Sequence, residues 1–293
     1  MTSIALIGPG AIGTTVAAAL HQVGRTPVVF GRSARDALRL RTGSGRVVVP
    51  GPVRTEGDPV DGPFDLVVVA VKTTQVDGVA PLLQAVCGPD TVVCVLQNGI
   101  EQVETVGPLV HGAAIVPAVV WFPATRGPDD EVLLHGAARL TLPAGAAADR
   151  VVAALDGSWC TVATTTDFHA VAWRKLLQNA VAGLMVLTGR RSGMYVREDV
   201  ADVARAYLRE CLAVARADGA VLDDGVVEAI LQGFRTRPAD LGTSILTDRT
   251  AGLPLEWDAR NGVVQRRGRR HGVRTPLSDV VVPLLAAASD GPG

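Results

Sequence analysis

The 293-residue chain lacks a long apolar run. Its longest nearly uninterrupted apolar stretch extends from Ala113 to Ala124 and is interrupted by Pro117 and Pro123. A membrane-spanning helix needs roughly 18 consecutive apolar residues, so we expect no transmembrane helix and no membrane partner. The sequence also starts with a strand-like run, without the basic stretch and cleavage pattern of an export signal. We therefore expect a cytoplasmic protein.

Cysteine and unbalanced charge are also scarce. The four cysteines have neither CxxC spacing nor a clustered histidine, so we expect no disulfide framework and no metal site. They are Cys87, Cys94, Cys160 and Cys211. The formal net charge of −1 gives no reason to expect a nucleic-acid partner. A local basic run, Arg266, Arg267, Arg269, Arg270 and His271, is interpreted as solvated surface.

Apolar residues are abundant, and the length of the chain predicts two domains. In the first half, short β-branched runs alternate with helix-compatible segments, which is typical of a doubly wound α/β fold with a mainly parallel sheet. The predicted strands are 4–7, 27–30, 66–71, 91–96 and 115–121, and the predicted helices are 12–23 and 75–86. A hairpin over 131–142 is expected to close this Rossmann domain, which spans residues 1–166.

The pattern changes at Asp167, a plausible N-cap residue. From there a helical pattern continues to Thr188, and Gly189 is the expected stop. Later segments, 199–218 and 224–234, also have helical period. The second domain, residues 167–293, is therefore predicted to be all-α.

A glycine-rich turn follows the first predicted strand and precedes the first predicted helix. Its glycines would permit a tight turn, close approach of the backbone to a pyrophosphate, and close packing of helix on strand. The helix N-terminus would offer N–H groups to the phosphates. GxGxxG alone is weak evidence, but this context predicts a dinucleotide site at Gly8, Pro9, Gly10, Ala11, Ile12 and Gly13.

The residue that reads the adenosine ribose is predicted to be Arg32. It lies 19 positions after Gly13, close to the offset of roughly 20 residues at which NAD-binding proteins carry a carboxylate. A guanidinium there favours the 2′-phosphate of NADPH, and Arg35 is one turn further on. The alternative is that both arginines are merely solvated.

Two polar residues follow buried strands of the predicted sheet. Lys72 comes after the apolar run 67–71, and Asn98 comes after 92–96. Ligands of open α/β sheets bind outside the carboxyl ends of the strands, so both residues are candidates for contact with cofactor or substrate. Ordinary loop chemistry is the alternative for each of them.

The long helix of the second domain carries Lys175 and Asn179 one turn apart on the same face. If this lysine faces a closed site, desolvation lowers its pKa and makes it a better proton donor. A lysine that extends to solvent is the alternative. Further polar clusters, 242–248 and 255–262, can equally be a capped helix and a charged surface turn.

Taken together, these segments resemble the ketopantoate reductase (2-dehydropantoate 2-reductase) family. The resemblance covers nearly the whole chain and rests on GPGAIG, VKTTQ around Lys72, QNGI around Asn98, RKLLQNA around Lys175, TSILTD around Ser244 and PLEWDARNG around Glu256. It implies an N-terminal Rossmann domain followed by a helical domain like the C-terminal domain of 6-phosphogluconate dehydrogenase.

The resemblance also implies an activity, the NADPH-dependent reduction of a small 2-oxo acid, foremost 2-dehydropantoate to pantoate, as in pantothenate biosynthesis. It makes Lys175 the general acid and a substrate contact, and it assigns substrate binding to Asn179 and Ser244. Glu256 is implied in catalysis and, with Lys72 and Asn98, in binding the nicotinamide side of the cofactor. A homodimer is one candidate assembly.

Two departures from the family pattern concern the substrate pocket. Family members usually carry Asn where this chain has Gly183, and a further expected Asn is replaced within 190–193, where Arg190 or Arg191 is a candidate anion clamp. An Asn at position 183 is expected to restore a hydrogen-bond donor for substrate. The alternatives are a related dehydrogenase for another 2-oxo or 3-hydroxy acid, or a catalytically silent NADPH-binding protein.

Overall fold

The computed structural model describes residues 2–291, which form two compact units. The sheet unit contains residues 2–97 and 102–168, and the helical unit contains residues 98–101 and 169–291. The short loop 98–101 therefore leaves the sheet unit and groups with helices that are distant in sequence.

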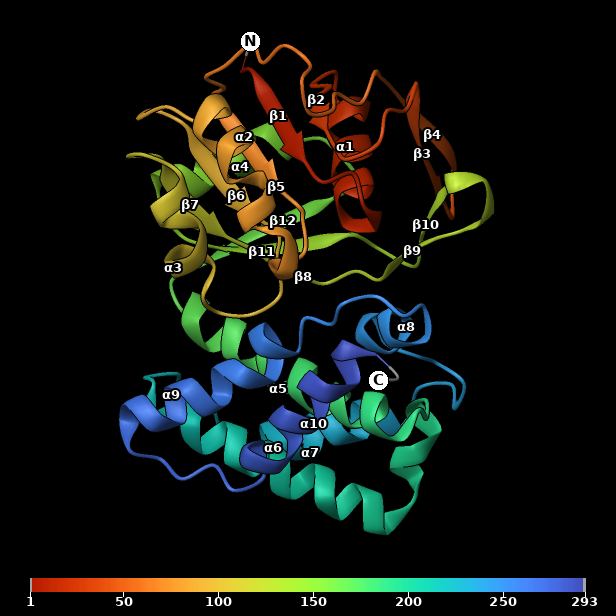
Figure 1. Cartoon of the computed structure of the whole chain (residues 1–293), viewed down its shortest axis with the longest axis vertical. Helices are drawn as coiled ribbons and strands as arrows, with labels where there is room; N and C mark the ends of the chain where they lie inside the picture. The colour runs from red at the N-terminus through yellow and green to blue at the C-terminus, as the bar shows by residue number, and fades with distance from the viewer. Residues whose placement is uncertain (1, 292–293) are drawn as a thin grey trace. The chain divides into compact units, whose positions relative to one another are not determined.

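The sheet unit is built on five parallel strands in the order β2-β1-β5-β6-β7 (Figure 1). Every residue of the three central strands is buried, which explains why they read as continuous apolar runs. The strands are β1 (Ile4–Ile7), β2 (Val28–Phe30), β5 (Leu66–Val69), β6 (Val92–Val95) and β7 (Ala114–Pro117).

Helices cover both faces of this sheet. Successive strand residues point to opposite faces, so Leu6 packs in one core with α1 (Ala11–Gln22) and α4 (Ala146–Leu155). Ile7 packs in a second core with α2 (Ala80–Val86) and α3 (Gln102–Val106). The predicted doubly wound Rossmann fold is confirmed.

Two smaller sheets complete the unit, and they correct the predicted hairpin over 131–142. One sheet has the order β4-β3-β10-β9 and the other β12-β11-β8, so β10 and β11 belong to different sheets. Gly136, in the middle of this range, lies between β10 and β11, which pair with other strands. The bounds are β3 (Ala37–Thr42), β4 (Gly45–Pro50), β8 (Val119–Val120), β9 (Ala124–Arg126), β10 (Val132–Leu134), β11 (Arg139–Pro143) and β12 (Thr161–Thr165).

The predicted strand 115–121 is likewise divided. Its first part is β7 of the parallel sheet, and its last part is β8, which pairs antiparallel with β11. Ala118 lies between them. Alternating hydrophobicity predicts where a strand lies but not which strand it pairs with. Here one apolar run contributes strands to two sheets.

The helical unit confirms the predicted all-α second domain. The long helix α5 (Phe168–Thr188) ends at Gly189, whose φ of 65° lies in the left-handed region that favours glycine. Trp173 of this helix is fully buried with Tyr207 and Phe234 of two other helices. Those and the remaining helices are α6 (Glu198–Ala217), α7 (Gly225–Arg235), α8 (Ser244–Thr250), α9 (Val263–His271) and α10 (Ser278–Asp290).

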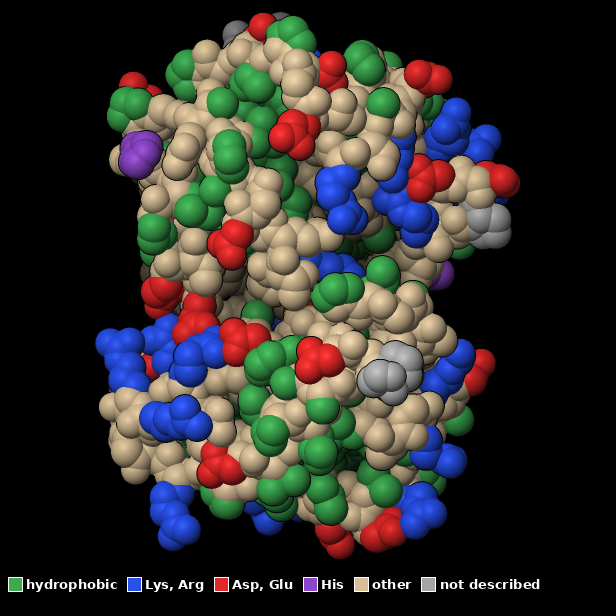
Figure 2. All heavy atoms as spheres, viewed as in Figure 1, with side chains coloured by type: hydrophobic (Ala, Val, Ile, Leu, Met, Phe, Trp, Pro, Cys, Tyr) green, Lys and Arg blue, Asp and Glu red, His purple; other side chains and the backbone are tan. Residues whose placement is uncertain are grey.

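The basic run identified in the sequence lies entirely on α9, where Figure 2 shows basic side chains gathered. Arg266 pairs with Glu101 at 2.7 Å and also with Asp258. Much of this positive charge is thus balanced locally. Within residues 2–291, no helix is long and apolar enough to cross a membrane, and no group of three metal-ligating side chains is placed to hold a metal ion.

Candidate active site

The turn between β1 and α1 has the backbone shape of a phosphate cradle. Gly8 has a φ of 94°, and a Cβ there would lie 2.8 Å from the backbone nitrogen of Val71. A Cβ on Gly13 would collide with the Gly8 carbonyl oxygen, so α1 packs directly on the turn. A Cβ on Gly10 would meet no atom of residues 2–291 within 4 Å. The backbone at Gly10 is therefore open to a ligand, which fits a pyrophosphate.

The start of α1 adds a positive electrostatic potential to this turn. Gly10 is the N-cap residue and supplies no side-chain cap. The N–H groups of the first turn have no acceptor within the helix, and they form the positive end of the helix dipole. Ala11 and Ile12 begin this helix and Pro9 precedes its N-cap, a geometry typical of helix N-termini that bind anions.

Arginines converge on the same turn. The carbonyl oxygen of Pro9 accepts hydrogen bonds from Arg35 Nη1 at 3.2 Å and Arg126 Nη2 at 2.8 Å. Both arginines also pair with Asp130. Burial and the neighbouring charge of Arg126 lower the pKa of Arg35, while Asp130 opposes this shift. Arg32 is exposed in the loop after β2, and within residues 2–291 its guanidinium has no ion-pair partner.

Packing places the Arg32 loop beside the glycine-rich turn. A Cβ on Gly31 would lie 2.9 Å from the ring of Pro9. Sequence reasoning missed Arg126, because this residue comes from β9 of a different sheet and lies 117 positions after Pro9. No local motif marks it, and only the folded chain brings it to the turn.

Lys72 and Asn98 follow neighbouring strands but belong to different units. Lys72 lies three residues beyond β5 in the sheet unit, is partly buried, and donates its backbone N–H to Gln75 Oε1 at 3.3 Å. Asn98 lies three residues beyond β6, in the loop that groups with the helical unit.

A buried polar cluster surrounds Asn98 in the helical unit. The Asn98 side chain donates from Nδ2 to Glu256 Oε2 at 3.2 Å and accepts at Oδ1 from Asn179 Nδ2 at 3.2 Å. Glu256 is only 5% exposed, and Asn179 is also buried. Three residues proposed from separate sequence motifs are therefore joined by direct hydrogen bonds.

Arg260 connects Ser244 to this cluster. Its Nη2 donates to Glu256 Oε2 at 3.2 Å and to Ser244 Oγ at 3.0 Å. The residue lies in a π-helical turn, Asp258–Gly262, in which both Arg260 and Asn261 are buried. Such turns are frequent at functional sites. Sequence reasoning did not single out Arg260, because a charged segment of ordinary helical period would place it at the surface.

Lys175 lies on α5, one turn before Asn179 and on the same face. Its side chain is partly buried. Desolvation, and then the positive charges of Arg260 and Arg237, lower the pKa of Lys175 from 10.5 to about 8. A pKa near neutrality suits a general acid, because the group carries a proton and releases it readily.

Gly183 differs from its expected role. A Cβ at this position would lie 3.0 Å from Asn261 Nδ2 and 3.0 Å from a methyl group of Leu285. Asn261 itself is fully buried and donates to the carbonyl oxygen of Ala180 and the hydroxyl of Tyr207. A side chain at 183 would thus enter the packed core, and the expectation that an Asn there restores a substrate contact is not supported.

We predict that Gly183→Asn destabilises the protein by about 1–3 kcal/mol, the usual cost of overpacking a core. Gly233→Asn is the matched control, because Gly233 also lies within a helix but has open space around its Cβ position. Denaturant unfolding of both variants measures the difference. Equal stability of the two variants would show that the core at position 183 adapts to the larger side chain.

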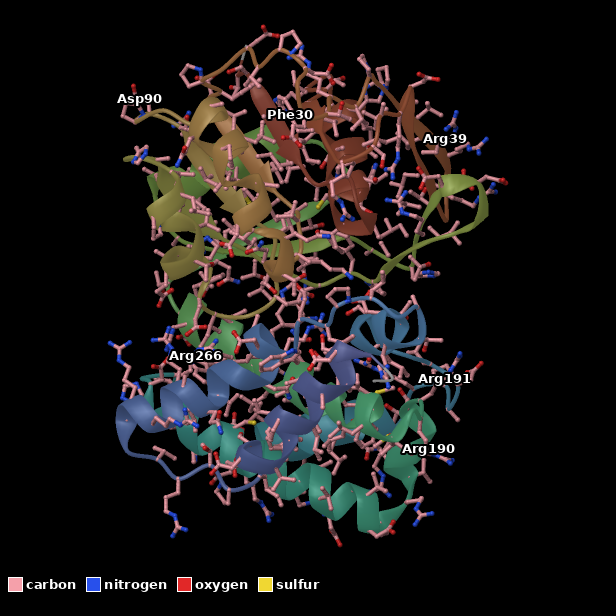
Figure 3. All side chains as sticks on the ribbon, viewed as in Figure 1. Phe30, Arg39, Asp90, Arg190, Arg191 and Arg266 are labelled. Carbon is pink, nitrogen blue, oxygen red and sulfur yellow. The ribbon has the colours of Figure 1, made fainter. Side chains whose placement is uncertain are left out.

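The arginines considered as an anion clamp, Arg190 and Arg191, are exposed beyond the end of α5 (Figure 3). Arg191 donates from Nη1 to the carbonyl oxygen of Asp240 at 2.8 Å. In the part of the chain that the structure describes, neither shares a hydrogen bond with the buried cluster.

Family models match both parts of the chain. The model described as "Ketopantoate reductase PanE/ApbA" matches residues 4–147, and the model described as "Ketopantoate reductase PanE/ApbA C terminal" matches residues 167–289. Together these matches cover most of the sequence.

Individual relatives match along their full length. The chain is 54% identical to a 2-dehydropantoate 2-reductase of Mycobacterium tuberculosis over 293 residues, which cover 100% of this chain and 99% of the relative. It is 37% identical to one from Caulobacter vibrioides, covering 99% and 100%. A solved dimeric ketopantoate reductase from Staphylococcus aureus superposes with a TM-score of 0.90 at 26% identity, covering 99% and 100% of the two chains.

Proposed function

The chain belongs to the ketopantoate reductase family, and on that premise we propose that it reduces 2-dehydropantoate (ketopantoate) to pantoate with NADPH. The observation that carries this proposal is the buried cluster of the helical unit. In it, a lysine of lowered pKa shares a helix face with Asn179, which is hydrogen-bonded to Asn98. A cationic acid beside neutral donors fits a ketone that gains negative charge during reduction.

The family and the Rossmann fold imply a nicotinamide cofactor, and the glycine-rich turn fits one. We propose that Gly8, Pro9, Gly10, Ala11, Ile12 and Gly13 hold the pyrophosphate, and that Arg32 binds the 2′-phosphate that distinguishes NADPH. Lys72, Asn98 and Glu256 are assigned to the nicotinamide side. The reduced nicotinamide, when bound, supplies a hydride for the ketone carbon.

Lys175 is proposed to donate a proton to the ketone oxygen as negative charge develops there. Asn179 and Ser244 would hold the substrate through hydrogen bonds. Glu256 fixes the orientation of its neighbours, because its Oε2 accepts from both Asn98 and Arg260. Its carboxylate is therefore proposed to act by positioning and binding, whereas the proton comes from Lys175.

Further parts of the proposal concern organisation. We assign NADPH binding to residues 1–166 and substrate binding and catalysis to residues 167–293. The Staphylococcus aureus relative is described as dimeric, which supports a homodimer for this chain as well. A cytoplasmic location stays a prediction.

A turnover assay tests the proposal against its alternatives. NADPH oxidation is followed with ketopantoate, other branched 2-oxo acids, and 3-oxo acids as substrates for a 3-hydroxy acid dehydrogenase. We expect the highest kcat/KM with ketopantoate. Preference for another compound would assign a different substrate, and NADPH binding without any turnover would identify a silent binding protein.

A further inference from the structure

Arg260 is a buried cation whose role is not explained by pairing alone. Only 2% of its surface is exposed, and it lies between two residues proposed to act on ligands. Within residues 2–291, the two side-chain hydrogen bonds of Arg260, to Glu256 and to Ser244, both come from Nη2. The contact with Glu256 is thus a single-point contact rather than the bidentate fork that arginine and carboxylate usually prefer.

The guanidinium group has donor capacity beyond these contacts. An arginine carries five N–H groups, and the Nε of Arg260 is buried without a hydrogen-bond partner among residues 2–291. A buried donor without an acceptor typically costs about 1–3 kcal/mol. A ligand carboxylate that accepted this hydrogen bond would remove that cost.

The positive charges around Lys175 also favour an anionic ligand. Arg260 and Arg237 both act on Lys175 as repulsive positive charges. Glu256 supplies a negative charge to this group and contacts Arg260 at 3.2 Å. A bound carboxylate would add further negative charge, at a place where burial makes the interaction stronger than in water.

We propose that Arg260 binds the carboxylate group of the substrate and thereby selects 2-oxo acids over neutral ketones. This inference rests on the proposed function. In this arrangement Lys175 serves the ketone oxygen while Arg260 serves the carboxylate on the adjacent carbon. Ser244, which already accepts from Arg260, supplies the neighbouring hydroxyl contact.

Inhibition by two matched ligands tests this role. Pantoate and its primary amide have the same size, but only pantoate carries a carboxylate. In Arg260→Gln, we expect the inhibition constant of pantoate against ketopantoate to rise at least tenfold, while that of the amide changes little. Arg260→Lys should retain part of the preference, since it keeps the charge but loses the planar fork.

A merely structural role for Arg260 would weaken both inhibitors equally, and that result would overturn the inference. If Arg260→Gln fails to fold because Glu256 loses its contact with the guanidinium group, the same ratio measured in Arg260→Lys decides the question, and an unchanged ratio rejects it. Wild-type turnover of ketopantoate is measured in the same series. Its absence would refute the proposed function itself, which is distinguishable from an unchanged inhibition ratio in an active enzyme.

Discussion

Lys175→Ala should lower kcat at least about 100-fold with a saturating 2-oxo acid, because the ketone oxygen loses its proton donor and the cation that stabilises it. The affinity for NADPH should change little, since Lys175 is assigned to the substrate. Arg174→Ala is the matched control: Arg174 is the preceding residue of α5 but is exposed. Steady-state kinetics and a cofactor titration separate the two effects. Near-normal kcat in Lys175→Ala would identify a lysine that merely extends to solvent.

The pH dependence of the reaction rate provides a second test of Lys175 as the proton donor. Its pKa of about 8 means that the protonated, active form dominates below pH 8. The wild-type kcat/KM, which reports groups of the free enzyme, should therefore fall as the pH rises through about 8. Lys175→Arg keeps a positive charge that does not titrate in this range, so its lower rate should lack this fall. A fall of the same size in both proteins would assign the titration to another group.

The lowered pKa of Lys175 also predicts an effect on stability. The folded state binds this proton less tightly than the unfolded state, so the charged amine costs folding free energy below pH 8. Lys175→Met should raise the thermal midpoint at pH 7, and its advantage over wild type should shrink between pH 8 and 10.5. If Lys175→Met were less stable than wild type throughout this pH range, the result would contradict a cost for burying the charged amine of Lys175.

Arg32→Asp should reduce the preference for NADPH over NADH by about 100-fold. The guanidinium would lose charge-assisted hydrogen bonds to the 2′-phosphate, each worth about 1.5–3 kcal/mol, and the new carboxylate would repel the phosphate. Dissociation constants from fluorescence titration with both cofactors measure the ratio.

The control for Arg32→Asp is Arg39→Asp, which makes the same charge change at an exposed position of β3 (Figure 3). It should leave the ratio unchanged if Arg32 acts through direct contact and not through net charge. A wild-type protein with equal affinity for the two cofactors would remove this assignment altogether.

Local features of the fold were predictable from the sequence. The first strand and its glycine-rich turn are predicted correctly. A backbone conformation such as the positive φ of Gly8 favours glycine, so the sequence itself indicates where it occurs. The long helix ending at Gly189 was placed for the same reason. The pairing between strands is harder to predict from the sequence. The alternation of apolar and polar residues alone does not show that β10 and β11 join different sheets.

The candidate site was only partly predictable. Separate motifs identified Asn98, Asn179 and Glu256, and the hydrogen bonds among them follow from tertiary structure. Arg260 escaped detection because a π-helical turn changes which residues face the interior. Arg126 escaped because its partner Pro9 is distant in sequence. Side chains that meet through long-range packing leave no local pattern.

The most direct test of the central claim is the fate of the hydride. NADPH deuterated at both C4 positions is incubated with the purified protein and ketopantoate, and the product is examined by mass spectrometry. We expect pantoate with one deuterium on its C2 carbon. Absence of pantoate, or pantoate without deuterium, would contradict the proposal that this protein reduces the 2-oxo acid with NADPH.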